Sequence, residues 1–97
     1  MQKLFGGDIE RMPKKKDLID KLCNKPIPKN FTTRELDLLM SKCNCTQYHG
    51  GRGSGLRYVH NGPEKRVLQF DGPHPGNELY NYQIKKVIKF LEDIGEI

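Results

Sequence analysis

The sequence is poor in cysteine and has no long apolar runs, and each shortage excludes a class of protein. It contains three cysteines, Cys23, Cys43 and Cys45. An odd number of cysteines, two of them one residue apart, does not make a disulfide framework and indicates a reducing compartment. No stretch approaches the apolar length of a membrane span, and residues 1–16 hold no apolar run of signal-peptide length. We therefore expect a cytoplasmic protein without a membrane partner.

The length of the chain limits its domain organisation. A chain of 97 residues can bury one hydrophobic core but not two. We expect a single domain over residues 17–97, after a flexible extension over residues 1–16 that is charged and lacks an apolar period. Met12, followed by a proline and three lysines, is a second possible start.

Basic residues outnumber acidic ones, with 17 against 12 and a formal net charge of +5. This balance suits an anionic partner without identifying it. Most of the excess lies before Phe31, so a nucleic-acid surface on the folded part has to be local. The candidate cluster there consists of Arg52, Arg57, Lys65 and Arg66.

Helical spacing of apolar residues predicts two helices in the first half of the chain. The first begins at Asp17 and ends before Pro26, since proline restricts the residue before it. The second is predicted to begin just after Thr32, because Thr32 and Glu35 have the spacing of a capping box. It continues to Cys43 as its last core residue.

A third helix is predicted over residues 79–94. Ile84, Val87, Ile88 and Leu91 repeat at helical spacing there, and Gly95 follows as a C-terminal cap. The lysines of this helix are interpreted as a solvated face.

Between the second and third helices, alternating β-forming residues predict three strands, over residues 45–49, 56–60 and 66–70. Leu56, Tyr58 and His60 share one face, whereas Arg57 and Val59 share the other. The expected fold is therefore α+β, with a half-buried three-stranded antiparallel sheet packed on helices.

The Gly-rich stretch over residues 50–55 is a candidate phosphate-binding turn. Its backbone N–H groups could face a phosphate, with Arg52 adding charge. It lacks the terminal Gly-Lys-Ser/Thr of a Walker motif and leads into a strand, which argues against binding of a nucleoside triphosphate. The alternative interpretation is a hairpin turn that needs glycine for positive φ values.

His74 is the candidate catalytic residue. It lies between two prolines in a loop near Asp71, and an imidazole with an ordinary pKa of about 6.5 can take and give protons near neutrality. RNA cleavage without a metal ion requires such a group. The alternative is a loop histidine that hydrogen-bonds nearby backbone and fixes the turn.

Other side chains are weaker candidates. Cys43, Cys45 and His49 do not make the four well-spaced ligands of a zinc site, so no metal or other cofactor is expected. Three tyrosines could stack on bases, although tyrosine at such positions more often packs against a core: Tyr58, Tyr80 and Tyr82.

From Phe31 onward, several short motifs follow one another in a particular order. They are the Phe31-Thr32 start, the Gly53-Ser54 turn entering a strand with Tyr58, the segment 73–79 around His74, Tyr82, and the closing helix that ends at Gly95. In this order and spacing the chain resembles the HicA family, the toxins of HicAB type II toxin–antitoxin systems, over about two-thirds of its length.

The resemblance implies a fold like that of double-stranded-RNA-binding domains and a function as an mRNA-cleaving endoribonuclease that needs no metal ion. It also implies a HicB-type antitoxin as a protein partner that covers the active surface. The residues expected to bind RNA are Arg52, Gly53, Ser54, Arg57, Lys65 and Arg66, and the one expected to catalyse is His74.

In such toxins a catalytic histidine is expected directly after the Gly-Ser turn, and this chain has Gly55 there. Two accounts follow. In the first, the chain is a ribonuclease in which His74 supplies acid–base catalysis beside Gly53, Ser54 and Arg57. In the second, it is a non-catalytic module of the same fold that binds RNA or the antitoxin. A weaker third possibility is a helix-containing protein-interaction domain unrelated to RNA.

Overall fold

The computed structural model describes residues 13–49, 55–73 and 76–97. Its elements follow in the predicted order, helix, helix, strand, strand, strand, helix. They are α1 (Lys15–Leu22), α2 (Thr33–Lys42), β1 (Cys45–His49), β2 (Gly55–His60), β3 (Val67–Asp71) and α3 (Asn81–Asp93). No helix in these ranges is both long and apolar enough to cross a membrane.

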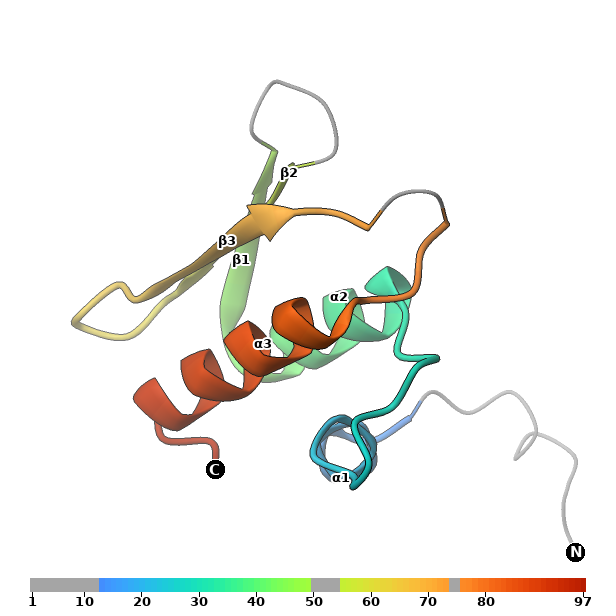
Figure 1. Cartoon of the computed structure of the whole chain (residues 1–97). Coiled ribbons are helices and arrows are strands. Elements are labelled where there is room, and N and C mark those ends of the chain that lie inside the picture. Colours follow the sequence, from blue (N-terminus) through green and yellow to red (C-terminus); the bar gives the residue numbers. More distant parts are fainter. Residues whose placement is uncertain (1–12, 50–54, 74–75) are drawn as a thin grey trace, which may run out of the picture.

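The strands form a three-stranded antiparallel sheet in the described part of the chain, in the order β1-β2-β3. The helices lie on one side of this sheet, with α2 packed against β1 and α3 against β3 (Figure 1). Alternation along β2 decides which side chains meet them. Tyr58 is buried beneath the helices, whereas Arg57 is exposed on the open face. The α+β prediction is confirmed.

The core lies between the sheet and the helices. Phe31, Leu36 and Leu39 are fully buried on the α2 side, and Ile84 and Val87 are fully buried on the α3 side. The four residues in the helices repeat at helical spacing and so share the inward face of α2 or α3, whereas Phe31 packs there from the chain before α2. The predicted core residue Cys43 is also buried, directly after the last turn of α2.

Helix α1 begins at Lys15, two residues before the predicted start. It therefore includes two lysines from the segment predicted to be a flexible extension. Lys16 pairs with Asp20 one turn later at 3.1 Å, and Leu18 and Leu22 are buried against α2. The packing of these two leucines, rather than helix propensity, holds so short a helix in place.

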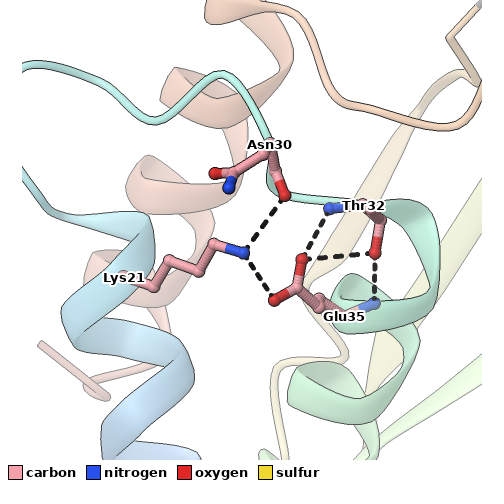
Figure 2. A network of polar contacts seen from close by, with 4 residues as sticks. All are labelled: Lys21, Asn30, Thr32 and Glu35. Atoms are coloured by element: carbon pink, nitrogen blue, oxygen red, sulfur yellow. Dashed lines mark hydrogen bonds and ion pairs between the residues drawn. The ribbon is translucent and has the colours of Figure 1, made fainter.

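A polar network joins α1 to the start of α2 (Figure 2). Lys21 Nζ lies 2.7 Å from Glu35 Oε2 and donates to the Asn30 carbonyl at 3.1 Å. Glu35 Oε1 accepts from the Thr32 backbone N–H at 2.9 Å, and the Glu35 N–H donates to Thr32 Oγ1 at 3.2 Å. The capping box predicted from Thr32 and Glu35 is confirmed, and Lys21 extends it to the neighbouring helix.

Helix α3 begins at Asn81 rather than at Leu79. Leu79 instead donates its backbone N–H to the Phe31 carbonyl at 2.8 Å, and Glu78 forms a β-bridge with Thr32. This pairing keeps the chain extended until it enters the helix. At the other end, Gly95 has a φ of +84° and caps the helix as predicted.

Gln83 fixes the start of α3 against the end of β3. Its side chain is fully buried, accepts from the Tyr80 backbone N–H at 2.7 Å and donates to the Asp71 carbonyl at 2.7 Å. Because both ends of the amide are bonded, the first turn of α3 is held beside the last residue of β3.

Candidate nucleic-acid interface

A hollow of about 600 Å³ opens where β2 and β3 end beside the start of α3. Its lining combines exposed polar side chains from the open face of the sheet with side chains from the helix. They are Gly55, Leu56, Arg57, Gln69, Phe70, Asp71, Tyr82 and Lys86. Arg57 and Gln69 are register partners on β2 and β3, so the strand pairing itself sets them side by side.

A second hollow, of about 440 Å³, continues along β3 and α3. It shares Gln69 and Lys86 with the first, so the two hollows adjoin at these two residues. We call these two adjoining hollows together the basic groove. Its cationic lining residues are Arg57, Lys85, Lys86 and Lys89, and Gln69 and Tyr82 line it beside them. Two aspartates, Asp71 and Asp93, lie at its ends, against four cationic side chains along it.

Lys86 lies at the centre of the basic groove. Its Nζ donates to the backbone carbonyl of Gln69 at 3.2 Å, which covers a polar group of strand β3 and ties α3 to it. An ammonium has three donors, so the group keeps donors for an anion in the groove. Lys89 in turn pairs with Asp93 at 3.3 Å.

Tyr82 projects from the first turn of α3 into the part of the groove that holds Arg57 and Lys86. Its exposed fraction is 57 %, and that of Tyr80 is 41 %. The two rings are in contact, with centroids 6.2 Å apart and planes tilted by 40°. The interpretation that tyrosines pack in the core therefore does not hold for these two.

Tyr58 takes the opposite role. It is 2 % exposed, and its phenol donates a hydrogen bond to the Asp37 carboxylate. Burial, the hydrogen bond and the charge of Asp37 raise the pKa of Tyr58 above its usual value. Tyr58 is a core residue and is not available to stack on a base.

The predicted basic cluster is divided between two ends of the sheet. Arg57 is exposed in the basic groove, near the first residue of β2. Lys65 and Arg66 lie beyond the other end of β2, in the connection to β3. Lys65 has a left-handed φ of +52°, and Arg66 Nε bonds Glu64 Oε1 at 2.8 Å. Neither residue lines the basic groove.

Four predicted site residues lie outside the described residues: Arg52, Gly53, Ser54 and His74. The residues that lead to them are described. Gly55 opens β2, Asp71 closes β3, and these two are register partners that both line the basic groove.

The remaining candidates have structural roles. His60 Nδ1 accepts from the backbone N–H of Gly62 at 3.3 Å and so fixes the turn after β2. Burial raises the pKa of Cys43 to about 12 and that of Cys45 to about 11. In the described ranges, no three His, Cys, Asp or Glu residues are grouped so that they could hold a metal ion.

Sequence reasoning missed the contribution of α3 to the groove. Lys85, Lys86 and Lys89 are exposed, as a solvated face predicts, and they also line a hollow against β3 that helical spacing alone does not reveal. A signal was present: Tyr82 precedes them at i−3, i−4 and i−7, which aligns one aromatic and three cationic residues on a single helix face. Only the packing of α3 beside β3 shows that this face meets Arg57.

Comparisons of the chain with protein-family models, with curated proteins and with solved structures give no match. The resemblance to the HicA family therefore depends on the sequence motifs. What the groove can bind depends on its own chemistry, namely guanidinium and ammonium groups for phosphates and an exposed phenol ring for an aromatic partner.

Proposed function

We propose that this chain is an RNA-directed domain of the HicA toxin type, an endoribonuclease that holds RNA in the basic groove and cleaves it without a metal ion. The observation that carries the proposal is the groove itself. Arg57 and Lys86 offer charge to phosphates, and Tyr82 offers a ring beside them. The finer assignment to a fold like that of double-stranded-RNA-binding domains is part of the same proposal.

In this proposal His74 supplies the proton transfers. A base removes the proton of a ribose 2′-hydroxyl, whose oxygen attacks the adjacent phosphorus. The bond to the 5′-oxygen then breaks as that oxygen is protonated, leaving a cyclic phosphate and a 5′-hydroxyl. Arg57 stays protonated throughout, so its role is to stabilise the negative charge of the phosphorane. Gly53 and Ser54 add donors to the same phosphate.

A HicB-type antitoxin is the proposed protein partner. Four cationic side chains line the basic groove against two aspartates, a balance that an acidic protein surface complements. Such a partner would exclude RNA from the groove by occupying it. The chain should therefore bind antitoxin or RNA, but not both at once.

The decisive experiment is incubation of the antitoxin-free protein with a long mRNA in EDTA, read on a denaturing gel. Wild type is compared with His74→Ala, and His60→Ala serves as the control because His60 lies outside the groove. Cleavage by wild type and by His60→Ala, but not by His74→Ala, supports the proposal. Cleavage that survives His74→Ala would remove His74 from the mechanism.

A second function is favoured by one observation. Gly55 stands where a HicA-like histidine is expected, and it lines the groove beside Arg57. Glycine transfers no proton, so a chain of this kind could bind RNA or an antitoxin without cleaving. Residues 55 and 57 share a face of β2, so Gly55→His would place an imidazole on the groove side. Cleavage gained by Gly55→His over an inactive wild type would support this second function.

A further inference from the structure

Tyr82 is exposed, unlike the large aromatic residues of the core. Phe31, Tyr58 and Phe90 are at most 4 % exposed, whereas Tyr82 is 57 % exposed and lines the basic groove. A ring with more than half of its surface exposed contributes less burial energy to the fold than a core ring does. It lies one helical turn from Lys86, on the same face of α3, and shares the hollow with Arg57.

We propose that Tyr82 is a stacking site for an unpaired nucleobase, so that the basic groove takes single-stranded rather than duplex RNA. The inference rests on the proposed RNA-binding function and adds the class of RNA to it. The Tyr80 ring, 6.2 Å away, borders the same site and widens the aromatic surface.

The chemistry of the groove supports single strands for a physical reason. In a duplex the faces of the bases are covered by their neighbours, and the major groove of A-form RNA is too narrow for side chains. A phenol ring can then reach the backbone, the 2′-hydroxyls and the base edges of the shallow minor groove, but not the face of a base. An unpaired base presents its face, and stacking on tyrosine needs no particular base because every base has a π-face. Arg57 and Lys86 then hold the flanking phosphates.

The position of Tyr82 is firm enough for this role. Gln83, the next residue, is fully buried and bonds both the Tyr80 N–H and the Asp71 carbonyl, at 2.7 Å each. Lys86 bonds the Gln69 carbonyl at 3.2 Å one turn later. The first turn of α3, which carries Tyr82, is thus held to β3 by two side chains that follow Tyr82 in the helix, so a stacked base gains contact without ordering a loop.

An acidic protein segment would be held differently. Cations can attract carboxylates, but a carboxylate gains little from the face of a phenol ring. Loss of the Tyr82 ring should therefore leave such binding almost unchanged, while loss of Arg57 or Lys86 weakens it. The effect of removing the Tyr82 ring on binding therefore distinguishes an RNA partner from an acidic protein segment.

The test uses the full chain and fluorescence anisotropy with three labelled probes. They are an oligouridylate of about eight nucleotides, the same strand with abasic ribose at its central positions, and a duplex of matching length. The variants are Tyr82→Leu, which keeps bulk but removes the π-face, and Tyr82→Phe, which keeps the ring. Tyr48→Leu is the matched control: Tyr48 is 50 % exposed and is the register partner of Arg57 on β1, but it does not line the groove, so it tests whether any exposed ring beside Arg57 would serve.

Tyr82→Leu should weaken binding of the intact strand by roughly tenfold and leave the abasic strand and the duplex unchanged. Tyr82→Phe and Tyr48→Leu should bind like wild type. Equal losses on intact and abasic strands, or no loss on the intact strand, would overturn the stacking site. If Arg57→Gln weakens binding while Tyr82→Leu does not, the stacking site fails and the proposed function stands. If wild type binds no probe at low salt, both fail.

Discussion

The phenol of Tyr58 on β2 donates its hydrogen bond to the carboxylate of Asp37 on α2, and so joins the sheet to the helix that covers it. Gln47 on β1 approaches the same phenol oxygen, with its Nε2 at 3.5 Å. Tyr58 is 2 % exposed, so its hydroxyl needs such a partner, because a buried polar group without one is destabilising by about 1–3 kcal/mol.

Alkaline pH should destabilise the fold through Tyr58. Its pKa in the folded chain is raised, first by burial and then by Asp37, above the unfolded value of about 10. The stabilising contribution of the neutral phenol is therefore complete below about pH 10 and is lost as the pH rises further. Urea unfolding followed by circular dichroism from about pH 8 to about pH 11 should show this loss in wild type.

Tyr58→Phe should unfold more easily by about 1–2 kcal/mol at neutral pH, because the hydrogen bond to a charged group is removed. It should also lose less stability than wild type above about pH 10. Tyr48→Phe is the control, since Tyr48 is half exposed. Parallel pH curves for wild type and Tyr58→Phe would contradict the prediction.

Acid should act on Glu35, at the junction of α1 and α2. Burial alone would raise the pKa of this carboxyl, but hydrogen bonds from Lys21 and Thr32, together with the Lys21 charge, lower it. The stabilising contribution is then present above the unfolded value of about 4.3 and is lost as the pH falls through the folded pKa.

Glu35→Gln should lower the free energy of unfolding by about 1 kcal/mol at neutral pH and flatten its decline in acid, because Gln keeps part of the cap but not the charge. Asp20→Asn is the matched control. It breaks the exposed pair with Lys16 and should change stability less. If the two variants lower the free energy of unfolding equally, the link between α1 and α2 stabilises the fold no more than an exposed ion pair does.

Salt dependence should distinguish groove cations from other surface cations. Arg57→Gln and Lys86→Gln should each weaken binding of single-stranded RNA regardless of its sequence and reduce the slope of log K against log salt by about 0.7–1. Lys65→Gln should change that slope less, since Lys65 lies outside the basic groove. A slope unchanged by Arg57→Gln and Lys86→Gln would place the RNA elsewhere.

The thiols should react slowly in the folded chain. Burial raises the pKa of Cys43 to about 12 and of Cys45 to about 11, and it also raises that of Cys23. Because the thiolate is the reactive form, alkylation by iodoacetamide near pH 8 should be much slower than in denaturant at all three positions. Mass spectrometry of timed samples measures it. Cys43 is 1 % exposed, directly after α2. If it were modified as fast as Cys23, the packing of α2 against the core would be contradicted.

Local patterns were sufficient where neighbouring residues decide the structure. The Thr32 and Glu35 capping box and the cap at Gly95 lie within a few residues of sequence, and both predictions are confirmed. Along β2 the predicted alternation holds for exposed Arg57 and buried Tyr58, whereas Leu56, Val59 and His60 are all half-buried. The start of α3 was wrong by two residues. Leu79 pairs with Phe31, which lies far away in the sequence and which no local pattern reveals.

The candidate site was predictable only in part for the same reason. Arg57 was identified as an exposed residue, and it is one. Its position in the helical pattern predicts that Lys86 points away from the core, and it is exposed, but the pattern does not show which residue it contacts. Its place beside Gln69 depends on α3 packing next to β3, which is a tertiary relationship.

Arg57 and Tyr58 are adjacent in β2, and one faces the groove while the other closes the core. A single-residue insertion in this strand would exchange their faces, burying a guanidinium and exposing the phenol that holds α2. Alternate residues of one strand therefore serve the stability of the fold and the lining of the groove. Evolution can vary β2 by substitution at alternate positions, but it cannot shift the strand to change one property and spare the other.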